Sequence, residues 1–226
     1  LQWVQVQNAE YSAGRNPIEA KVVVDCIAEC LHKHPEQSIG VITFNIQQRL
    51  TILDAIDERC LQDQSFQENF ARANQESIDK QPFVKSLENV QGDERDIILF
   101  SVGHSPVQRK GLTGTEWRVP ARFGPLARKG GERRLNVAIS RAKQKCIVIA
   151  SFTPEQLSVG NTKHNGPKLL KLFLEYAYAS SNEQKINASL RLNEAAMIDY
   201  KHSETQITQI HSIPEATPLD VQITLA

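Results

Sequence analysis

The feature that most restricts the fold is a short apolar run at residues 97–102, bounded on both sides by turn-forming and charged residues. A run of this length and setting predicts a buried strand. Similar runs occur at residues 39–44 and 146–151, and stretches with helical periodicity separate them. Because alternating strands and helices are typical of a parallel sheet, we expect an α/β fold with helices on both faces of the sheet.

The spacing of apolar residues gives the other expected elements. Strands are predicted at residues 3–6, 39–44, 83–87, 97–102 and 146–151. Helices are predicted at residues 18–34, 47–61, 130–143 and 167–179. Pro17 suits the first turn of the first helix, because its fixed backbone is compatible with a helix start. The polar segment 62–81 predicts a loop with some helix.

Charge and composition limit the kinds of partner. The chain has 26 basic and 26 acidic residues and a formal net charge of zero. It therefore lacks an overall basic field, and any affinity for nucleic acid must come from a local patch. No run approaches a transmembrane helix and no signal peptide is visible, so we expect no membrane partner. The expectation of a cytoplasmic protein comes from the cysteines, which are expected to be reduced. Since Leu1 already lies in an expected strand, the chain has the form of an excised fragment.

The four cysteines do not suggest a disulfide framework. Cys26 and Cys30 are four residues apart on an expected helix, with His32 and His34 nearby, which leaves open a zinc-binding regulatory module. That spacing fits no common zinc finger, and the other two cysteines have no partner nearby in the sequence. We therefore favour reduced thiols and predict no metal site.

Arginine residues recur in segment 130–143. If the segment is a helix, Arg134 and Arg141 are seven residues apart and share one face, roughly 10 Å apart along the axis. The opposite face, with Leu135 and Ile139, can pack on a core. Two guanidinium groups so spaced suit a polyphosphate, because each can hold phosphate through two hydrogen bonds. The alternative is an ordinary solvated helix face.

Polar residues also gather before the strand at 97–102, in the segment 86–96. Open α/β sheets place ligands at the mouths of buried strands. This segment therefore joins the arginine segment as a candidate site.

Four segments carry a resemblance to superfamily 1 helicases. Ser86-x-Glu88-x-x-Gln91-Gly92-x-Glu94 resembles motif V, and residues 133–143 (RRLNVAISRAK) resemble motif VI. Residues 39–49 (IGVITFNIQQR) resemble motif IV, and residues 16–20 (NPIEA) resemble a short Asn-x-x-Glu-Ala element that opens the domain. Their order and spacing fit the branch of the nonsense-mediated-decay helicase, and most closely its large bacterial members.

The resemblance implies that residues 1–180 form the second RecA-like domain of such a protein, with a basic loop insertion at 103–130. Residues 181–226 are expected to be a linker or the start of a further domain. The chain has no Gly-x-x-x-x-Gly-Lys-[Ser/Thr] loop and no acidic Walker B strand end. The resemblance implies that ATP and Mg²⁺ are bound mainly by the first RecA-like domain of the same polypeptide. It also implies that a single strand, with DNA favoured over RNA, crosses both domains.

The resemblance also assigns roles at the nucleotide. Arg141 matches the motif VI arginine that reaches the γ-phosphate, and Arg134 assists it or forms a structural ion pair with Glu94 or Asp96. The other expected nucleotide-binding residues are Glu94, Gly92, Gln91, Arg15 and Glu19. Relatives often carry an arginine inside the Asn-x-x-Glu-Ala element where this chain has Pro17. Either Arg15 substitutes for it, or the phosphate clamp is weaker in this chain.

Contacts with nucleic acid are expected elsewhere. Thr43, Ser86 and Glu88 match positions that touch the strand or couple it to ATP, and Gln48 matches the motif IV glutamine. The alternative for each is a capped turn or strand end. In segment 103–130, glycines alternate with basic residues and an aromatic. A basic loop that includes Trp117, Arg118 and Arg122 can hold a single strand by charge and base stacking, unless it is only a surface loop.

The function expected from the sequence is therefore that of an ATP-dependent helicase or translocase. A non-catalytic nucleic-acid-binding or scaffolding module from a degenerate helicase is the alternative. An intact phosphate-binding lysine and Walker B acids in the rest of the protein would separate the two.

Overall fold

The computed structural model describes residues 1–181 apart from 112–113 and 120–122. The expected linker at 181–226 thus lies outside the described residues except for its first residue, as does Arg122 of the expected basic loop. In the described part, no helix is long and apolar enough to cross a membrane.

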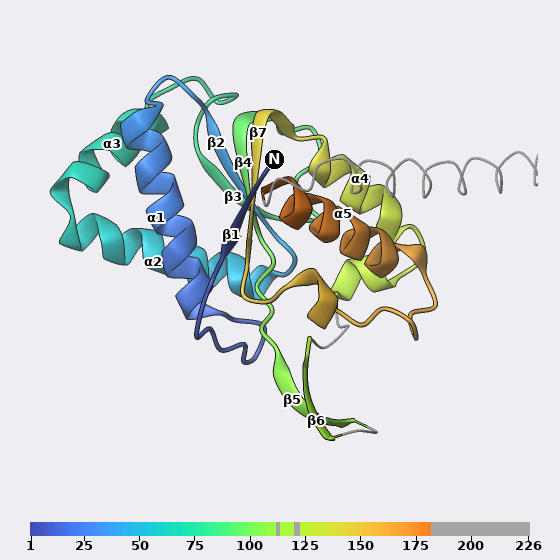
Figure 1. Cartoon of the computed structure of the whole chain (residues 1–226). Coiled ribbons are helices and arrows are strands. Elements are labelled where there is room, and N and C mark those ends of the chain that lie inside the picture. The colour runs from blue at the N-terminus through green and yellow to red at the C-terminus, as the bar shows by residue number, and fades with distance from the viewer. Residues whose placement is uncertain (112–113, 120–122, 182–226) are drawn as a thin grey trace, which may run out of the picture.

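A five-stranded sheet forms the centre of the molecule (Figure 1), and every strand pair in it is parallel. In spatial order the strands are β1 (Gln2–Gln5), β7 (Ala142–Ala150), β4 (Arg95–Ser101), β2 (Ile39–Thr43) and β3 (Phe83–Ser86). The amino ends of all strands therefore lie at one edge of the sheet and the carboxyl ends at the other. These two edges are called the amino edge and the carboxyl edge below.

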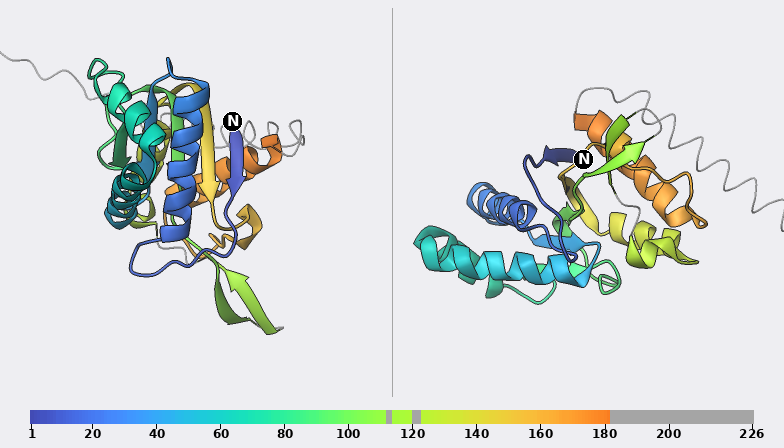
Figure 2. Two further views of the ribbon diagram at one scale, coloured as in Figure 1. Left: turned by 90° about the vertical axis from the view of Figure 1, so that its left-hand side faces the viewer. Right: turned by 90° about the horizontal axis from the view of Figure 1, so that it is seen from below.

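Helices cover both faces of this sheet (Figure 2). One face carries α1 (Pro17–Lys33), α2 (Ile46–Gln62) and α3 (Gln64–Asn74). The other face carries α4 (Gly131–Ile139), α5 (Asn165–Ser181) and the short 3-10 helix η1 (Gly124–Ala127). A second 3-10 helix, η2 (Pro154–Gln156), follows β7. The α/β fold predicted from the sequence, a RecA-like parallel sheet with helices on both faces, is confirmed.

Alternate residues of the buried strands form two separate cores. Val41 and Leu99 pack with the apolar faces of α1 and α2, whereas Ile42 and Phe100 pack with α4 and α5. Because neighbouring strand residues point to opposite faces, continuous apolar strands can fill both cores at once. This double burial explains why the buried parts of β2 and β4, residues 39–42 and 97–100, contain no polar side chain.

The helices α1 and α2, which follow the strands β1 and β2 in the chain, both begin at the carboxyl edge. The side chain of Asn16 caps α1 by accepting a hydrogen bond from the backbone N–H of Glu19 (3.0 Å). Asn45 caps α2 by accepting from the N–H of Gln48 (2.8 Å). Such caps satisfy backbone donors that a helix start leaves unpaired. They also fix Glu19 and Gln48, one turn into each helix, close to the strand ends.

Most of the helices and strands predicted from the sequence are confirmed, whereas the segments 62–81 and 103–130 differ from the prediction. The five strands and the helices α1, α2 and α5 lie where the sequence predicts them, within a few residues. The polar segment 62–81, expected to be mainly loop, contains the helix α3. The segment 103–130, expected to be a basic loop, contains an antiparallel hairpin of β5 (Val107–Gly111) and β6 (Gly114–Arg118) that extends from the carboxyl edge (Figure 1).

Candidate functional site

The arginine helix expected at residues 130–143 is shorter than the sequence suggested. It ends at Ile139, and the chain enters β7 at Ala142, which pairs with Arg95 of β4. Pairing with a buried parallel strand thus overrides helical continuation. The expectation that Arg134 and Arg141 share one helix face is therefore wrong. Arg134 is exposed on α4, whereas Arg141 lies in the turn between α4 and β7 at the amino edge.

The start of α4 depends on two glycines. Gly130 has a φ of 79°, in the left-handed region that glycine tolerates best. At Gly131 a side chain would collide with the backbone carbonyl of Leu126 in η1. This close approach seats α4 against η1 and sets where the helix, and hence Arg141, meets the sheet.

The Arg141 guanidinium is held by three acceptors from two segments. Its Nε donates to the carbonyl of Val137 (2.7 Å) and an Nη donates to Ser140 Oγ (3.0 Å). The other Nη lies 3.5 Å from the Glu94 carboxylate. The Arg141 side chain is 17 % exposed and that of Glu94 is 48 % exposed. The predicted structural ion pair with Glu94 is therefore made by Arg141 in place of Arg134.

Glu94 reaches this position through the segment that follows β3. The segment begins at the carboxyl edge, where the Leu87 N–H donates to the carbonyl of Thr43 (2.8 Å). It crosses the sheet beside α4 and ends at Glu94, immediately before β4 begins at the amino edge. Gly92 takes a φ of 88° in this crossing, and no atom lies within 4 Å of the place that a side chain would occupy. Gln91, Gly92 and Glu94 are all exposed, so this surface is open to a ligand.

The carboxyl edge holds a second polar cluster, which is buried. Glu19 is fully buried, and both of its carboxylate oxygens accept hydrogen bonds. Oε1 accepts from the N–H of Gly103 (2.6 Å) and from Ser101 Oγ (2.8 Å). Oε2 accepts from Ser151 Oγ (2.8 Å) and, more weakly, from the Asn16 amide (3.4 Å). Glu19 thus joins α1 to the ends of β4 and β7.

Gln48 extends this cluster from α2. Its Oε1 accepts from the backbone N–H of Asn16 (2.7 Å), and its Nε2 donates to the carbonyl of Asn16 and to Ser101 Oγ (both 3.2 Å). Gln48 is also fully buried. We call the set Asn16, Glu19, Gln48, Ser101 and Ser151 the buried polar network. It ties four elements together at the carboxyl edge.

Burial raises the pKa of Glu19 from 4.5 to about 7, because desolvation disfavours the carboxylate more than the hydrogen bonds from Gly103, Ser151 and Ser101 favour it. A nucleotide could reach this carboxylate only if the network opened. The geometry gives Glu19 a positioning role, and its expected contact with nucleotide stays a prediction.

Arg15 lies at the carboxyl edge as well. It precedes Asn16, whose amide contacts Ser151 Oγ (3.0 Å), and its guanidinium donates to Gln47 Oε1 (3.2 Å). The nine residues of β7 separate Ser151 from Arg141, a length of roughly 30 Å. Arg15 and Arg141 thus lie at opposite edges of the sheet and do not face one phosphate group in this structure; the expected contact of Arg15 with nucleotide stays a prediction.

Thr43 and Ser86 end the neighbouring strands β2 and β3, and they are paired in register. Both are buried; Thr43 Oγ1 donates to the carbonyl of Asn45 (2.9 Å). This is the geometry of the alternative interpretation, a capped strand end. Glu88, one residue beyond the buried Leu87, is exposed. With Ser86 and Arg128 it lines a groove of about 360 Å³.

The hairpin separates its side chains onto two faces. Trp117 pairs with Gln108 and is 55 % exposed. Arg118 is the next residue of β6 and therefore lies on the opposite face of the hairpin from Trp117. Its Nε donates to the carboxylate of Glu116 in the same strand (2.6 Å). The charge of Arg118 is therefore partly neutralised, while the Trp117 ring remains available. Their expected contacts with nucleic acid stay predictions.

Sequence reasoning missed Ser101 and Ser151. A signal was present, because each is a hydroxyl residue that directly follows four apolar residues of an expected strand. Their common partner Glu19 is 82 residues before the first and 132 before the second, so the sequence alone does not join them.

No group of three or more potential metal ligands occurs in residues 1–181 outside the undescribed gaps. Burial raises the pKa of the Cys26 thiol to about 12, with smaller contributions from Cys30 and nearby acids. Cys26 is thus a protonated thiol at neutral pH.

Comparison with known proteins identifies the family. Residues 2–153 match the family described as "AAA domain". The chain belongs to this family. It is also 36 % identical over 171 residues to the "Uncharacterized ATP-dependent helicase MG140 homolog" of Mycoplasma pneumoniae and to the "Uncharacterized ATP-dependent helicase MG140" of Mycoplasma genitalium. These alignments cover 75 % of this chain but 14 % of each relative.

Proposed function

We propose that this chain is the second RecA-like domain of an ATP-dependent superfamily 1 helicase or translocase, in the branch of the nonsense-mediated-decay helicase. The supporting observation is the pairing of Arg141 with Glu94 beside the open backbone of Gly92, in a member of the AAA domain family. The relatives named as ATP-dependent helicases support the same activity. The first RecA-like domain of the same polypeptide would face this amino edge.

The residues at the amino edge fit a nucleotide phosphate. ATP, with Mg²⁺ held mainly by the first domain, supplies the phosphoryl group that is transferred. Arg141 provides a permanent cation that can neutralise charge developing on that group. Its ion pair with Glu94 is long and partly exposed, and such pairs contribute at most about 1 kcal/mol. A phosphate can therefore displace Glu94 from Arg141 at small cost, after which Glu94 is free to contact the nucleotide.

The carboxyl edge would carry the single strand. Thr43, Ser86 and Glu88 lie there, and the hairpin with Trp117 and Arg118 extends from the same edge. In this arrangement, ATP-driven motion of the first domain against this one would move the strand along the carboxyl edge. DNA is proposed as the preferred strand.

The test compares two arginines of one segment in the full-length protein. Arg141→Ala is expected to lower ATP turnover by about 10³- to 10⁵-fold, the range that arginine fingers supply. Arg141→Lys should recover little, because an ammonium cannot reproduce the planar guanidinium. Arg134→Ala is the matched control with a smaller expected loss. Normal turnover in Arg141→Ala would remove the finger role, and an unfolded variant, detected by thermal melting, would assign Arg141 to structure.

A non-catalytic nucleic-acid-binding or scaffolding module is the alternative function. The exposed Trp117 ring supports binding without requiring hydrolysis. The rest of the parent protein discriminates: an intact Walker A lysine and Walker B acids support the enzyme, and their loss supports the module. In either case the 226-residue chain alone should hydrolyse no ATP above background, since it carries no phosphate-cradling loop.

A further inference from the structure

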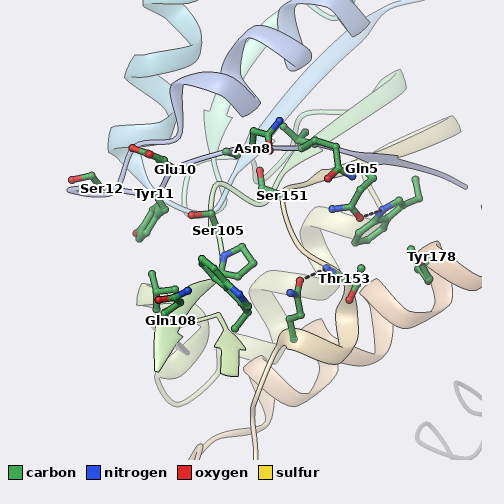
Figure 3. Close-up of a pocket in the computed structure, with 18 of the residues that line it drawn as sticks. Gln5, Asn8, Glu10, Tyr11, Ser12, Ser105, Gln108, Ser151, Thr153 and Tyr178 are labelled. Atoms are coloured by element: carbon green, nitrogen blue, oxygen red, sulfur yellow. Dashed lines mark hydrogen bonds between the residues drawn. The ribbon is translucent and has the colours of Figure 1, made fainter. Parts of the chain in front are cut away.

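A broad groove of about 1350 Å³ lies at the carboxyl edge, between the end of β1, the base of the hairpin and the end of α5. Figure 3 shows side chains from all three parts around it, among them Asn8, Gln108 and Tyr178. The groove is far larger than the neighbouring one beside Glu88, and Tyr11 lines both. Together the two depressions pass the carboxyl ends of all five strands.

The chemistry of this groove differs from that of a phosphate site. Among the described residues that line it, Glu10 alone carries a charge at neutral pH, and that charge is negative. A phosphate backbone is bound through lysine and arginine, and an acidic residue repels it. The groove therefore offers no electrostatic grip on the backbone of a strand.

What the groove offers is aromatic rings and neutral amides. Trp3, Tyr11, Trp117 and Tyr178 line it, as do the amides of Gln5, Asn8, Gln108 and Gln156. Aromatic faces stack on nucleobases of any kind, and amides both donate and accept hydrogen bonds, as base edges do.

Two of these rings have distinct positions. The Trp3 ring packs edge-on against Tyr178, with 5.3 Å between ring centroids, and its indole N–H donates to Gln5 Oε1 (3.1 Å). Trp3 is thus part of a fixed wall. Trp117, on the hairpin, is 55 % exposed and lines the same groove.

We propose that this groove is a base-binding site, in which unpaired nucleobases of the single strand stack on Trp117 and hydrogen-bond to the surrounding amides. The proposal rests on the proposed function, because it concerns the strand that the domain would hold. It adds that the domain grips this part of the strand by its bases, while phosphate contacts lie outside the groove.

The chain contains a built-in reporter for this site. It has two tryptophans, and both line the groove. Intrinsic fluorescence of the 226-residue chain therefore measures entry of bases without a label. The titrants are a single-stranded thymidine oligonucleotide and an abasic oligonucleotide of equal length, which keeps every phosphate but lacks the bases.

The expected result is quenching and binding by the thymidine strand, and at least tenfold weaker binding by the abasic strand. Trp117→Ala should weaken thymidine binding about tenfold or more, in the range of one lost stacked base, and Trp117→Phe should restore much of it. Arg118 lies on the other face of the hairpin, so Arg118→Ala should change the affinities for the thymidine and the abasic oligonucleotide by the same factor. Leu61→Ala, a highly exposed residue of α2, is the control for general effects of substitution.

Three outcomes would overturn the proposal in different ways. Equal binding of thymidine and abasic strands would show that the strand is held by phosphates, which rejects the base site but leaves the proposed function standing. Binding of the thymidine strand with unchanged fluorescence would place the bases elsewhere. If the 226-residue chain bound neither strand, the base site would be rejected. If the full-length protein bound neither strand as well, the nucleic-acid part of the proposed function would also fail.

Discussion

The two edges of the sheet each present a glutamate to a polar cluster, but in opposite ways. At the amino edge, Glu94 is about half exposed and makes one long ion pair with Arg141 (3.5 Å). At the carboxyl edge, Glu19 is fully buried and accepts four hydrogen bonds from four different residues. The first arrangement can exchange partners at little cost, and the second cannot, since each buried donor would lose its acceptor.

This difference suggests a division of labour. In the proposed function a phosphate would take the place of Glu94, and the contact of Arg141 with Glu94 is the long, partly exposed one that can be exchanged at small cost. A surface that holds a strand needs fixed supports, and the buried polar network fixes the ends of β4 and β7 and the residue Gly103 that leads into the hairpin. If the proposed function holds, the domain would combine an amino edge that rearranges with a carboxyl edge that stays rigid.

The largest effect on stability is expected for Glu19→Ala. It leaves donors of Ser101, Gly103 and Ser151 buried without an acceptor, so we expect a loss of about 3 kcal/mol or more in the free energy of unfolding. Glu29→Ala is the matched control, because Glu29 lies on the same helix but is exposed and makes a surface ion pair with Lys33. Urea unfolding of both variants of the 226-residue chain measures the difference. Equal effects would show that the network does not support the carboxyl edge.

An effect of similar size is expected from pH. The pKa of Glu19 is raised from 4.5 to about 7, so the folded state binds a proton more tightly than the unfolded state. Its contribution to stability is fully present below pH 4.5 and is lost as pH rises through about 7, at up to roughly 1.4 kcal/mol per pH unit. Glu19→Gln should flatten this part of the stability profile between pH 5 and 8. A variant with the same slope as the natural sequence would place the titration elsewhere.

The smallest effect is expected for Glu94→Gln. Because the ion pair with Arg141 is partly exposed, its loss should change the free energy of unfolding by less than about 1 kcal/mol. Thermal melting with and without added salt checks this. A loss comparable with that of Glu19→Ala would mean that the amino edge is as rigid as the carboxyl edge and would remove the contrast between them.

The sequence predicted the central strands well because residues 39–42, 97–100 and 147–150 are buried between the two layers of helices and form uninterrupted apolar runs. It failed at residues 140–143, where helical spacing continues past the end of α4. There the pairing of Ala142 with Arg95 decides the backbone, and that partner is 47 residues away in the chain. Local periodicity carries no information about such a partner.

The candidate site was predicted only in part, again because contacts between residues distant in the chain decide it. The motifs identify both Glu94 and Arg141 as site residues. The sequence predicts an ion pair of Arg134 with Glu94 or Asp96, whereas the structure pairs Glu94 with Arg141 because α4 ends at Ile139. Glu19 was found as a polar residue of a motif, and its burial was not foreseen. Its partners Ser101 and Ser151 come together only when β4 and β7 lie side by side.

In the proposed function the two edges do separate work: Arg141 acts on the nucleotide, and the carboxyl edge holds the strand. The most direct measurement determines ATP turnover and nucleotide-free affinity for a single-stranded oligonucleotide on one preparation of the full-length Arg141→Ala variant. The account predicts turnover lower by about three orders of magnitude or more, with strand affinity within about twofold of the natural protein. Loss of both together, or turnover that survives, would contradict it.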